Sequence, residues 1–172
     1  ETSMRCTLRP WDMEDAGPLA LLCSNLAVQN NLRDGFPYPY TKQDGEAFLA
    51  SVLAADPQEL FSFAILADGQ LAGSITAYRQ GNIHRRTAEL GYYLGEPYWG
   101  KGIATCAVQQ FCRHLFATTD LLRIFAEPFS TNRASCRVLE KAGFQREGLL
   151  RKNAVKNGVV RDMVLYALVR EE

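Results

Sequence analysis

Hydrophobic and polar residues follow two periods along this chain, and their order predicts a sheet interrupted by helices. Alternation with a period of two, or short apolar runs, predicts strands at residues 4–9, 61–67, 71–78, 86–94, 122–127, 144–151 and 159–169. Helical spacing predicts helices at 12–24, 41–55, 104–115 and 132–142, with Leu19, Leu22, Cys23 and Leu26 on one face of the first. The order β-α-α-β-β-β-α-β-α-β-β favours an α+β fold whose sheet has mixed strand directions.

Local signals set the boundaries of these elements. Thr41 and Asp44 form a capping-box pattern before the second helix, and Gly143 stands where a helix usually ends. Asp68-Gly69 and Asn157-Gly158 are signals for tight hairpins. Residues 32–40 contain two prolines and a glycine, so we expect this segment to be irregular.

The strand at 86–94 has two different faces. Ala88, Leu90, Tyr92 and Leu94 make one face, whereas Glu89, Gly91 and Tyr93 make the other.

Composition narrows the class of protein. The 172 residues predict a single domain from 4 to 172, and we expect Glu1-Thr2-Ser3 to be an expression remnant before a natural start at Met4. Nineteen basic residues balance nineteen acidic ones, so no global basic field for nucleic acid exists. We expect no membrane segment, no metal site and a cytoplasmic location, with the five cysteines reduced.

The run Tyr98-Trp99-Gly100-Lys101-Gly102-Ile103-Ala104-Thr105 joins a strand to the strongest amphipathic helix of the chain. Two interpretations fit this run. It is either a tight turn that needs glycine, or a phosphate cradle in which backbone N–H groups and a helix N-terminus face an anion. A dinucleotide-binding loop is disfavoured, because Thr105 stands where the pattern GxGxxG needs its third glycine.

The helix at 132–142 carries a polar pair at its start. Ser135 shares a face with the apolar residues Val138, Leu139 and Ala142, and Asn132 lies one turn earlier. The Ser135 hydroxyl either bonds back to the carbonyl of Thr131 or points into a ligand cleft. Arg133, Arg137 and Lys141 form a basic row, for which a solvated face is the favoured interpretation.

These motifs together resemble those of the GCN5-related N-acetyltransferase (GNAT) superfamily, and within it the RimJ/RimL branch of ribosomal-protein N-terminal acetyltransferases. The resemblance rests on the loop at 99–105, on Asn132-x-x-Ser135 and on Glu140-Lys141-Ala142-Gly143-Phe144. Further matches are 36–41, 89–94 and 162–166, so nearly the whole chain from Met4 is covered. The resemblance implies a seven-stranded, mixed, mostly antiparallel sheet that is splayed between strands 4 and 5 and has helices on both faces.

The same resemblance implies an acetyl-CoA-dependent N-acetyltransferase that needs no metal. Main-chain groups of the loop would hold the CoA pyrophosphate, and the backbone around Leu94 would hold the pantetheine arm. The cofactor-binding residues implied are Leu94, Trp99, Gly100, Lys101, Gly102, Ile103, Ala104, Thr105 and Asn132. Trp99 departs from the Gln or Arg usual in the superfamily, and Cys106 departs from the branch's glutamate without a role that we can infer.

Acetyl transfer to an amine needs a proton acceptor and a proton donor. Glu89 is the candidate base, either directly or through water, although a surface carboxylate is the competing interpretation, and Ser135 is the candidate donor to the departing thiolate. Tyr38, Tyr40 and Tyr93 either line the acceptor site or belong to the core, and Arg85-Arg86 either attracts an acidic acceptor or borders a turn.

The resemblance further implies that the acceptor is a primary amine, of a protein N-terminus or of a small molecule, that reacts by direct attack. The alternative function is a CoA-binding sensor without turnover. The sequence does not reveal the oligomeric state, and a homodimer is the commonest symmetric assembly.

Overall fold

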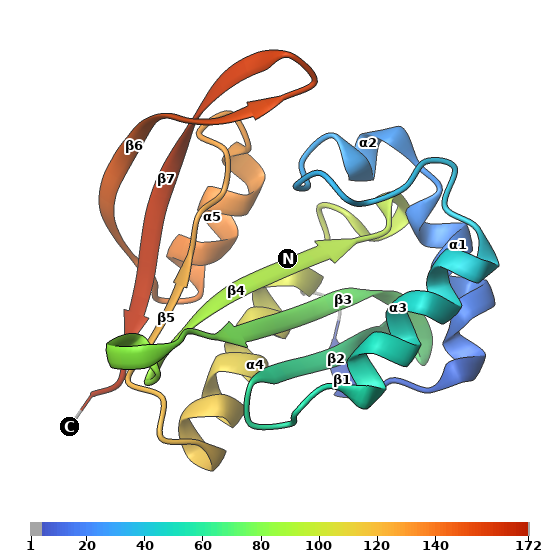
Figure 1. Cartoon of the computed structure of the whole chain (residues 1–172), viewed down its shortest axis with the longest axis horizontal. Helices are drawn as coiled ribbons and strands as arrows, with labels where there is room; N and C mark the ends of the chain where they lie inside the picture. The colour runs from blue at the N-terminus through green and yellow to red at the C-terminus, as the bar shows by residue number, and fades with distance from the viewer. Residues whose placement is uncertain (1–4, 172) are drawn as a thin grey trace.

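The structure is a computed structural model that describes residues 5–171, and its centre is one seven-stranded sheet (Figure 1). The expected start at Met4 and the preceding remnant lie outside the described residues. Neighbouring strands pair antiparallel except β4 and β5, which are parallel, and this confirms the mixed sheet predicted above. The order across the sheet is β1-β2-β3-β4-β5-β7-β6, with strands β1 (Cys6–Arg9), β2 (Leu60–Ala67), β3 (Gln70–Arg79), β4 (Thr87–Leu94), β5 (Arg123–Ala126), β6 (Gln145–Lys156) and β7 (Val159–Val169).

The sheet is splayed between β4 and β5. The two strands pair only from Thr87 to Glu89 on β4 and from Arg123 to Phe125 on β5, whereas β4 continues to Leu94. Beyond Glu89 the strands diverge, and Figure 1 shows β5, β7 and β6 turning away from β4 toward the top of the view. Within the described residues, this part of β4 therefore has a strand partner on its β3 side alone, which leaves backbone groups free to face the gap.

Helices cover both faces, and each face has its own hydrophobic core (Figure 1). The helices α4 (Ile103–Thr118) and α5 (Arg133–Lys141) pack on the first core, and α1 (Ala16–Cys23) and α3 (Lys42–Ala54) on the second. The alternation predicted for β4 is confirmed, since Leu90 belongs to the first core and Tyr93 packs against the second.

The first predicted helix ends where the sequence indicated, but it begins with a 3₁₀ turn and does not include Leu26. A 3₁₀ turn, η1 (Met13–Asp15), precedes α1, which ends at Cys23, and Leu26 begins a separate helix, α2 (Leu26–Gln29). The cause is Asn25, whose side chain accepts a hydrogen bond from the N–H of Ala27 and starts the new helix. Leu26 is consequently about half exposed and does not extend the buried face that the helical spacing predicted.

The turn and cap signals are confirmed. Thr41 and Asp44 form the capping box of α3, and Gly143 adopts a φ of +98° just after α5. Both residues of Asp68-Gly69 and of Asn157-Gly158 have positive φ, as tight hairpins require. The strand β6 extends five residues beyond the predicted end at 151, across a shift of register between Leu150 and Ala154.

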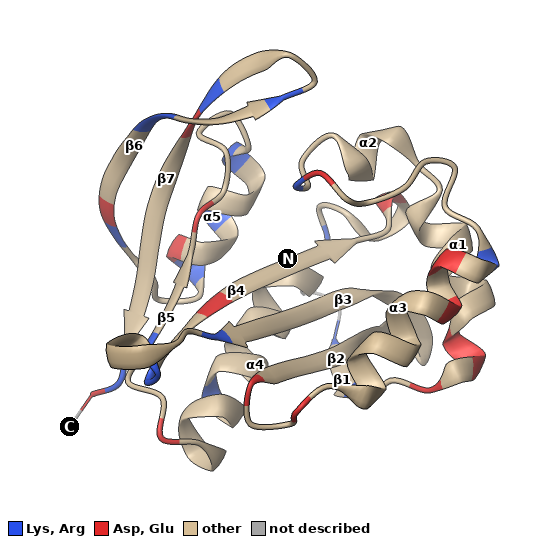
Figure 2. Cartoon of the chain, viewed as in Figure 1, with Lys and Arg blue, Asp and Glu red and all other residues tan. Residues whose placement is uncertain are grey.

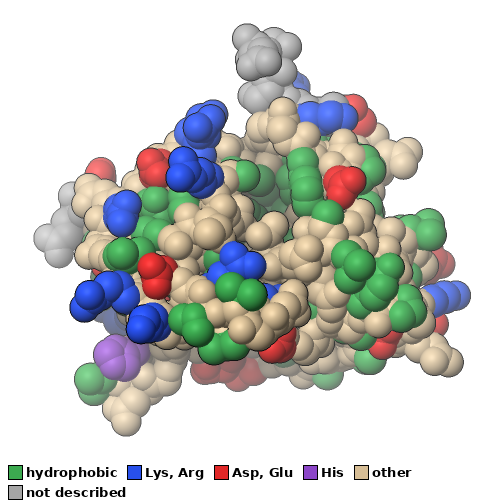
Figure 3. Space-filling model, turned by 90° about the horizontal axis from the view of Figure 1, so that it is seen from above, with side chains coloured by type: hydrophobic (Ala, Val, Ile, Leu, Met, Phe, Trp, Pro, Cys, Tyr) green, Lys and Arg blue, Asp and Glu red, His purple; other side chains and the backbone are tan. Residues whose placement is uncertain are grey.

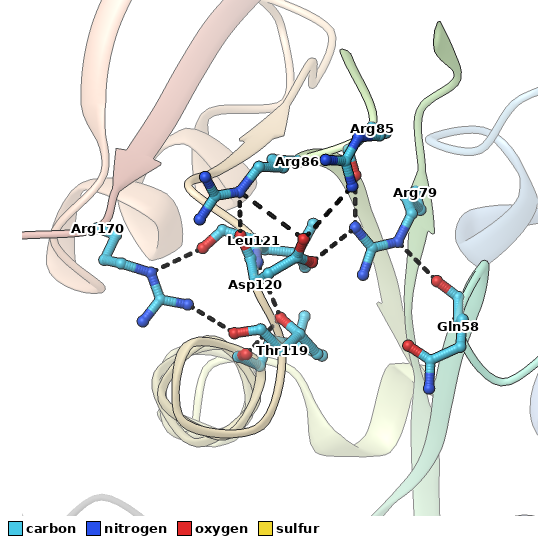
Figure 4. Close-up of polar contacts among 9 residues, drawn as sticks. Gln58, Arg79, Arg85, Arg86, Thr119, Asp120, Leu121 and Arg170 are labelled. Atoms are coloured by element: carbon cyan, nitrogen blue, oxygen red, sulfur yellow. Dashed lines mark hydrogen bonds and ion pairs between the residues drawn. The ribbon is translucent and has the colours of Figure 1, made fainter. Parts of the chain in front are cut away.

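Arginine side chains connect several segments at the end of the sheet where β4 and β5 are still paired (Figure 4). Arg79 on β3 donates to the Asp120 carboxylate at 3.0 Å, and Arg85 and Arg86 form ion pairs with the same carboxylate at 3.7 and 3.8 Å. Arg170, just after β7, donates to the carbonyls of Leu121 and Thr119. The pair Arg85-Arg86 thus borders the turn through η2 (Asn82–His84) that precedes β4, the second of the two interpretations above.

No helix among residues 5–171 combines the length and the apolar character that crossing a membrane requires.

Candidate active site

The glycine loop leads into α4 as the sequence predicted. Gly102 is the N-cap of the helix with a φ of +78°, and Gly100 has a φ of +73°, a region that favours glycine. No side chain caps the helix, so the N–H groups of its first turn remain available to an anion. The sixteen-residue helix adds the positive end of its dipole to this site.

Trp99 fastens this loop to the end of β4. Its indole N–H donates to the carbonyl oxygen of Leu94 at 2.9 Å, across the short turn η3 (Glu96–Tyr98). The side chain that replaces the superfamily's usual polar residue therefore has a structural partner. It holds the loop against the strand edge where the sheet opens.

A cleft of about 920 Å³ extends from the glycine loop along α5. Its lining includes four cationic side chains, and among the described residues that line it none is acidic. Three of the four, Arg133, Arg137 and Lys141, are the basic row for which the sequence favoured a solvated face; all three are exposed, and they also line this cleft. Figure 2 shows basic residues at several positions along α5. A cation-rich cleft that ends at a helix N-terminus fits a ligand with several phosphate groups.

The start of α5 places Ser135 beside β4. Asn132 is the N-cap, and its side-chain oxygen accepts a hydrogen bond from the Ser135 N–H at 3.2 Å. The Ser135 hydroxyl lies 2.7 Å from the hydroxyl of Tyr92, so the expected alternative of a bond back to Thr131 is not found. Burial raises the pKa of Tyr92 to about 12, although the bond to Ser135 opposes this rise, so the phenol stays protonated at neutral pH.

Tyr92 is a site residue that sequence reasoning missed. The sequence placed it correctly on the apolar face of its strand, but its polar partner lies 43 residues away in the chain. Burial of a tyrosine usually requires a partner for its hydroxyl, which is the signal that was available. Ser135 and Tyr92 share a cavity of about 220 Å³ with Leu94, Trp99 and Gly100.

A second large cleft, of about 830 Å³, lies on the other face of β4. Tyr40 and Tyr93 line it together with Phe36, whose ring stacks on Tyr40 at 4.9 Å and meets Tyr93 edge-on at 5.5 Å. Tyr38 is half exposed and is not among the residues that line this cleft. Two of the three predicted tyrosines are therefore brought together, while the third is not.

Glu89 faces the same cleft and is paired with a cation. Its carboxylate accepts a hydrogen bond from Arg33 at 2.9 Å, and Arg33 comes from the irregular segment after α2. Sequence reasoning did not single out Arg33, because 56 residues separate the two partners.

Seen from above, the molecule is hollowed between its two halves, with hydrophobic side chains on the walls and basic ones near the rim (Figure 3).

Comparison with known proteins agrees with this geometry. The family model of the acetyltransferase (GNAT) domain matches residues 5–145. The probable N-acetyltransferase YjcK of Bacillus subtilis is 36% identical over 96% of this chain and 94% of its own length. Among solved structures, Mycobacterium smegmatis RimJ in complex with CoA-disulfide has a TM-score of 0.85 at 27% identity, covering 98% of this chain and 86% of RimJ.

A ribosomal α-N-protein acetyltransferase, RimL, in complex with coenzyme A has a TM-score of 0.86 at 23% identity, covering 98% of this chain and 95% of RimL. At that identity the likeness shows the fold alone. The family match and the relationship to YjcK go further: this chain belongs to the GNAT family of N-acetyltransferases.

Proposed function

We propose that this protein transfers the acetyl group of acetyl-CoA to a primary amine by direct attack in a ternary complex. The observation that carries the proposal is a series of three adjoining cavities along the splayed sheet. The 920 Å³ cleft shares Leu94, Gly100 and Val138 with the 220 Å³ cavity, which in turn shares Tyr92 with the 830 Å³ cleft. The cationic 920 Å³ cleft lies at one end of this series, and the 830 Å³ cleft with the Glu89 carboxylate lies at the other.

Each cavity of this series suits one part of acetyl-CoA. The loop of Gly100 and Gly102, with the four cations of the cleft, fits the pyrophosphate and the third phosphate. The narrower cavity, with walls mainly of apolar residues, fits the thin pantetheine arm. The free edge of β4 offers backbone groups to the amides of this arm, as a neighbouring strand would.

Ser135 is the proposed proton donor to the sulfur. The neutral amine attacks the thioester carbonyl carbon, a C–N bond forms, and the C=O electron pair moves onto oxygen. Collapse of this intermediate breaks the C–S bond, and the electron pair leaves with sulfur. The Ser135 hydroxyl gives sulfur a proton, and the Tyr92 hydroxyl, 2.7 Å away, is placed to replace it. The nitrogen loses a proton on the acceptor side, so the transfer balances.

Glu89 is the proposed carboxylate of the acceptor side, where it binds the incoming ammonium beside Arg33. The demand on this side depends on the amine. An α-amine with a pKa near 8 is about one-tenth neutral at pH 7, at a deprotonation cost of about 1.4 kcal/mol, whereas a lysine-like amine costs about 4.6 kcal/mol. A protein N-terminus or a similar α-amine therefore suits a site that relies mainly on positioning.

The proposal is tested by calorimetric titration with acetyl-CoA, followed by assays of free-CoA release with a panel of amines. The panel contains a short peptide with a free N-terminus, spermidine and free amino acids. Gly102→Asp adds a side chain at a positive φ and a negative charge in the cradle, so we expect it to abolish binding. Binding without release by any amine would favour a CoA sensor, and absence of binding by folded wild-type protein would refute the proposal.

A further inference from the structure

Two cysteines from distant parts of the chain lie together where β1 contacts α4, and neither has a role so far. Cys6 is the first residue of β1, and Cys106 lies at the start of α4. Both thiols are free. Cys106 is also the residue that departs from the glutamate of the RimJ/RimL branch, so its side chain calls for a reason of its own.

The side chain of Gln110 contacts both sulfurs. Its Nε2 atom lies 3.2 Å from the Sγ of Cys106 and 3.7 Å from the Sγ of Cys6, and it donates to the Cys6 carbonyl oxygen at 2.9 Å. Gln110 follows Cys106 by one turn of α4, so both side chains face β1. The thiols also affect each other, because burial raises the pKa of Cys6 to about 12 and the neighbouring Cys106 thiol adds to the rise.

The two thiols differ in their access to solvent. Cys6 belongs to the core of the α4 face and is 4% exposed, whereas Cys106 is partly exposed. A dissolved oxidant therefore reaches Cys106 first, and the sheltered Cys6 reacts with the product that forms there. An accessible thiol beside a second thiol is the arrangement that converts oxidation into a disulfide.

No other two cysteines within residues 5–171 share a polar partner. The Cys23 thiol donates to the Tyr93 hydroxyl at 3.4 Å, and Cys136 lies beside Tyr166. Cys112 is buried, and this burial raises its pKa to about 12. The chain thus contains three further thiols against which the behaviour of the pair can be measured.

The pair adjoins the phosphate cradle. The Cys106 N–H donates to the carbonyl oxygen of Gly102, the N-cap of α4, at 3.1 Å. Ala104 and Thr105, just before Cys106, line the cation-rich cleft. A covalent bond from Cys106 to β1 pulls on the helical turn whose N–H groups face the anion. Displacement of these donors weakens charge-assisted hydrogen bonds, because their strength depends steeply on geometry.

We propose that Cys6 and Cys106 form a reversible disulfide in the presence of hydrogen peroxide, and that this bond lowers the affinity for acetyl-CoA. The effect on affinity rests on the proposed function, because it needs acetyl-CoA in the cradle. Formation of the disulfide depends on the two thiols alone.

The oxidation takes place in two steps. The Cys106 sulfur attacks one peroxide oxygen, an S–O bond forms and the O–O bond breaks, and the departing oxygen leaves as water with the thiol proton. The Cys6 sulfur then displaces the hydroxyl group of this sulfenic acid, and the proton of Cys6 completes a second water. The two thiols thus lose two electrons and two protons to the peroxide, and a dithiol reductant reverses the change.

The first experiment maps the bond. The protein is treated with a small excess of hydrogen peroxide, free thiols are blocked with iodoacetamide, and a digest is measured by mass spectrometry. We expect a cross-link between the peptides of Cys6 and Cys106 that a dithiol reductant removes. The matched control Cys136→Ser, which replaces another partly exposed thiol, should form the same cross-link. Cys6→Ala leaves Cys106 without a partner, so Cys106 should gain oxygen and form no cross-link.

The second experiment measures the consequence for the cradle. Calorimetry should give a dissociation constant for acetyl-CoA about tenfold higher in oxidised than in reduced wild-type protein, the effect of weakening one hydrogen bond to a charged group. Reduction should restore the original value. Cys106→Ser should bind acetyl-CoA like reduced wild-type protein before and after treatment with peroxide.

Each part of the inference has its own contrary result. Absence of the cross-link in wild-type protein, or a cross-link to another cysteine, would overturn the disulfide. A Cys6–Cys106 cross-link that leaves the dissociation constant unchanged would overturn its effect on affinity. Absence of acetyl-CoA binding by reduced wild-type protein would refute the proposed function and that effect with it, while the peptide map still decides whether the disulfide forms.

Discussion

Two glycines on neighbouring strands should respond to the same substitution in opposite ways. A Cβ atom at Gly91 on β4 would meet nothing within 4 Å. A Cβ atom at Gly73 on β3 would overlap the carbonyl oxygen of Tyr93 and lie 3.0 Å from the Cα of Leu94. Gly73 opposes Leu94 in the ladder, so relief of the overlap requires β3 and β4 to move apart beside the splay.

The magnitudes follow from these surroundings. Gly91 has no positive φ, so alanine fits its backbone, and loss of freedom in the unfolded chain should stabilise Gly91→Ala by about 0.4–1 kcal/mol. At about 2–4 °C per kcal/mol for a chain of this size, Tm should rise by roughly 1–4 °C. Forced repacking in Gly73→Ala should cost about 1–3 kcal/mol, which lowers Tm by roughly 2–12 °C.

Activity should separate from stability at Gly91. A methyl group there enters the 830 Å³ cleft and a cavity of about 100 Å³ that Gly91 lines with Ser135, so kcat/KM for the acceptor should fall by about tenfold or more. Gly91→Leu should lower it further, while the dissociation constant of acetyl-CoA stays at the wild-type value. Thermal unfolding, calorimetry and steady-state kinetics on the same preparations measure the three quantities. A lower Tm in Gly91→Ala, or unaltered acceptor kinetics in Gly91→Leu, would refute this view of the acceptor site.

Three further predictions concern the proton donor, the cationic cleft and the arginine network. Ser135→Ala should lower kcat by no more than about 10²–10⁴-fold without weakening acetyl-CoA binding, and rates equal to wild type would remove Ser135 from the mechanism. Arg137→Ala should weaken acetyl-CoA binding by about tenfold or more, with a smaller effect at high salt, when calorimetry compares it with the exposed Arg113→Ala on α4. Hydrogen bonding to Arg79 lowers the pKa of Asp120, so its contribution to stability is present above the unfolded pKa of about 3.9 and lost as pH falls through the folded value. Asp120→Asn should therefore lower Tm at neutral pH and flatten its fall in acid, and an acid profile identical to wild type would contradict the network of Figure 4.

Most of the fold was predictable because its signals are local. The alternation along β4, the capping box of Thr41 and the hairpin at Asn157-Gly158 depend on residues within a few positions of one another, and all are confirmed. The extra helix α2 was missed because Asn25 reads as an ordinary polar residue until its cap is seen. The hydrogen bond between the Asn25 side chain and the Ala27 N–H caps the start of this second helix.

The site was predictable only where one segment contains it. The glycine loop needs no distant partner, and Ser135 was found through its spacing from Asn132. The partners of Tyr92 and Arg33 depend on which segments become neighbours in the fold, information that the sequence pattern does not contain. Periodicity also identifies an exposed row such as that of Arg137 without saying whether it faces bulk water or a cleft.

The short β4–β5 ladder has a mechanical consequence. Three residue pairs form the seam between a plate made of β1 to β4 and a plate made of β5, β7 and β6. Beyond these pairs the two plates are joined by side chains of their common core, and among the described residues no strand ladder crosses the far end of the seam. A molecule that lies in the gap touches both plates and acts as a crosspiece, so binding stiffens the protein most where the ladder is missing. The ligand proposed above would thus supply part of the rigidity of this fold.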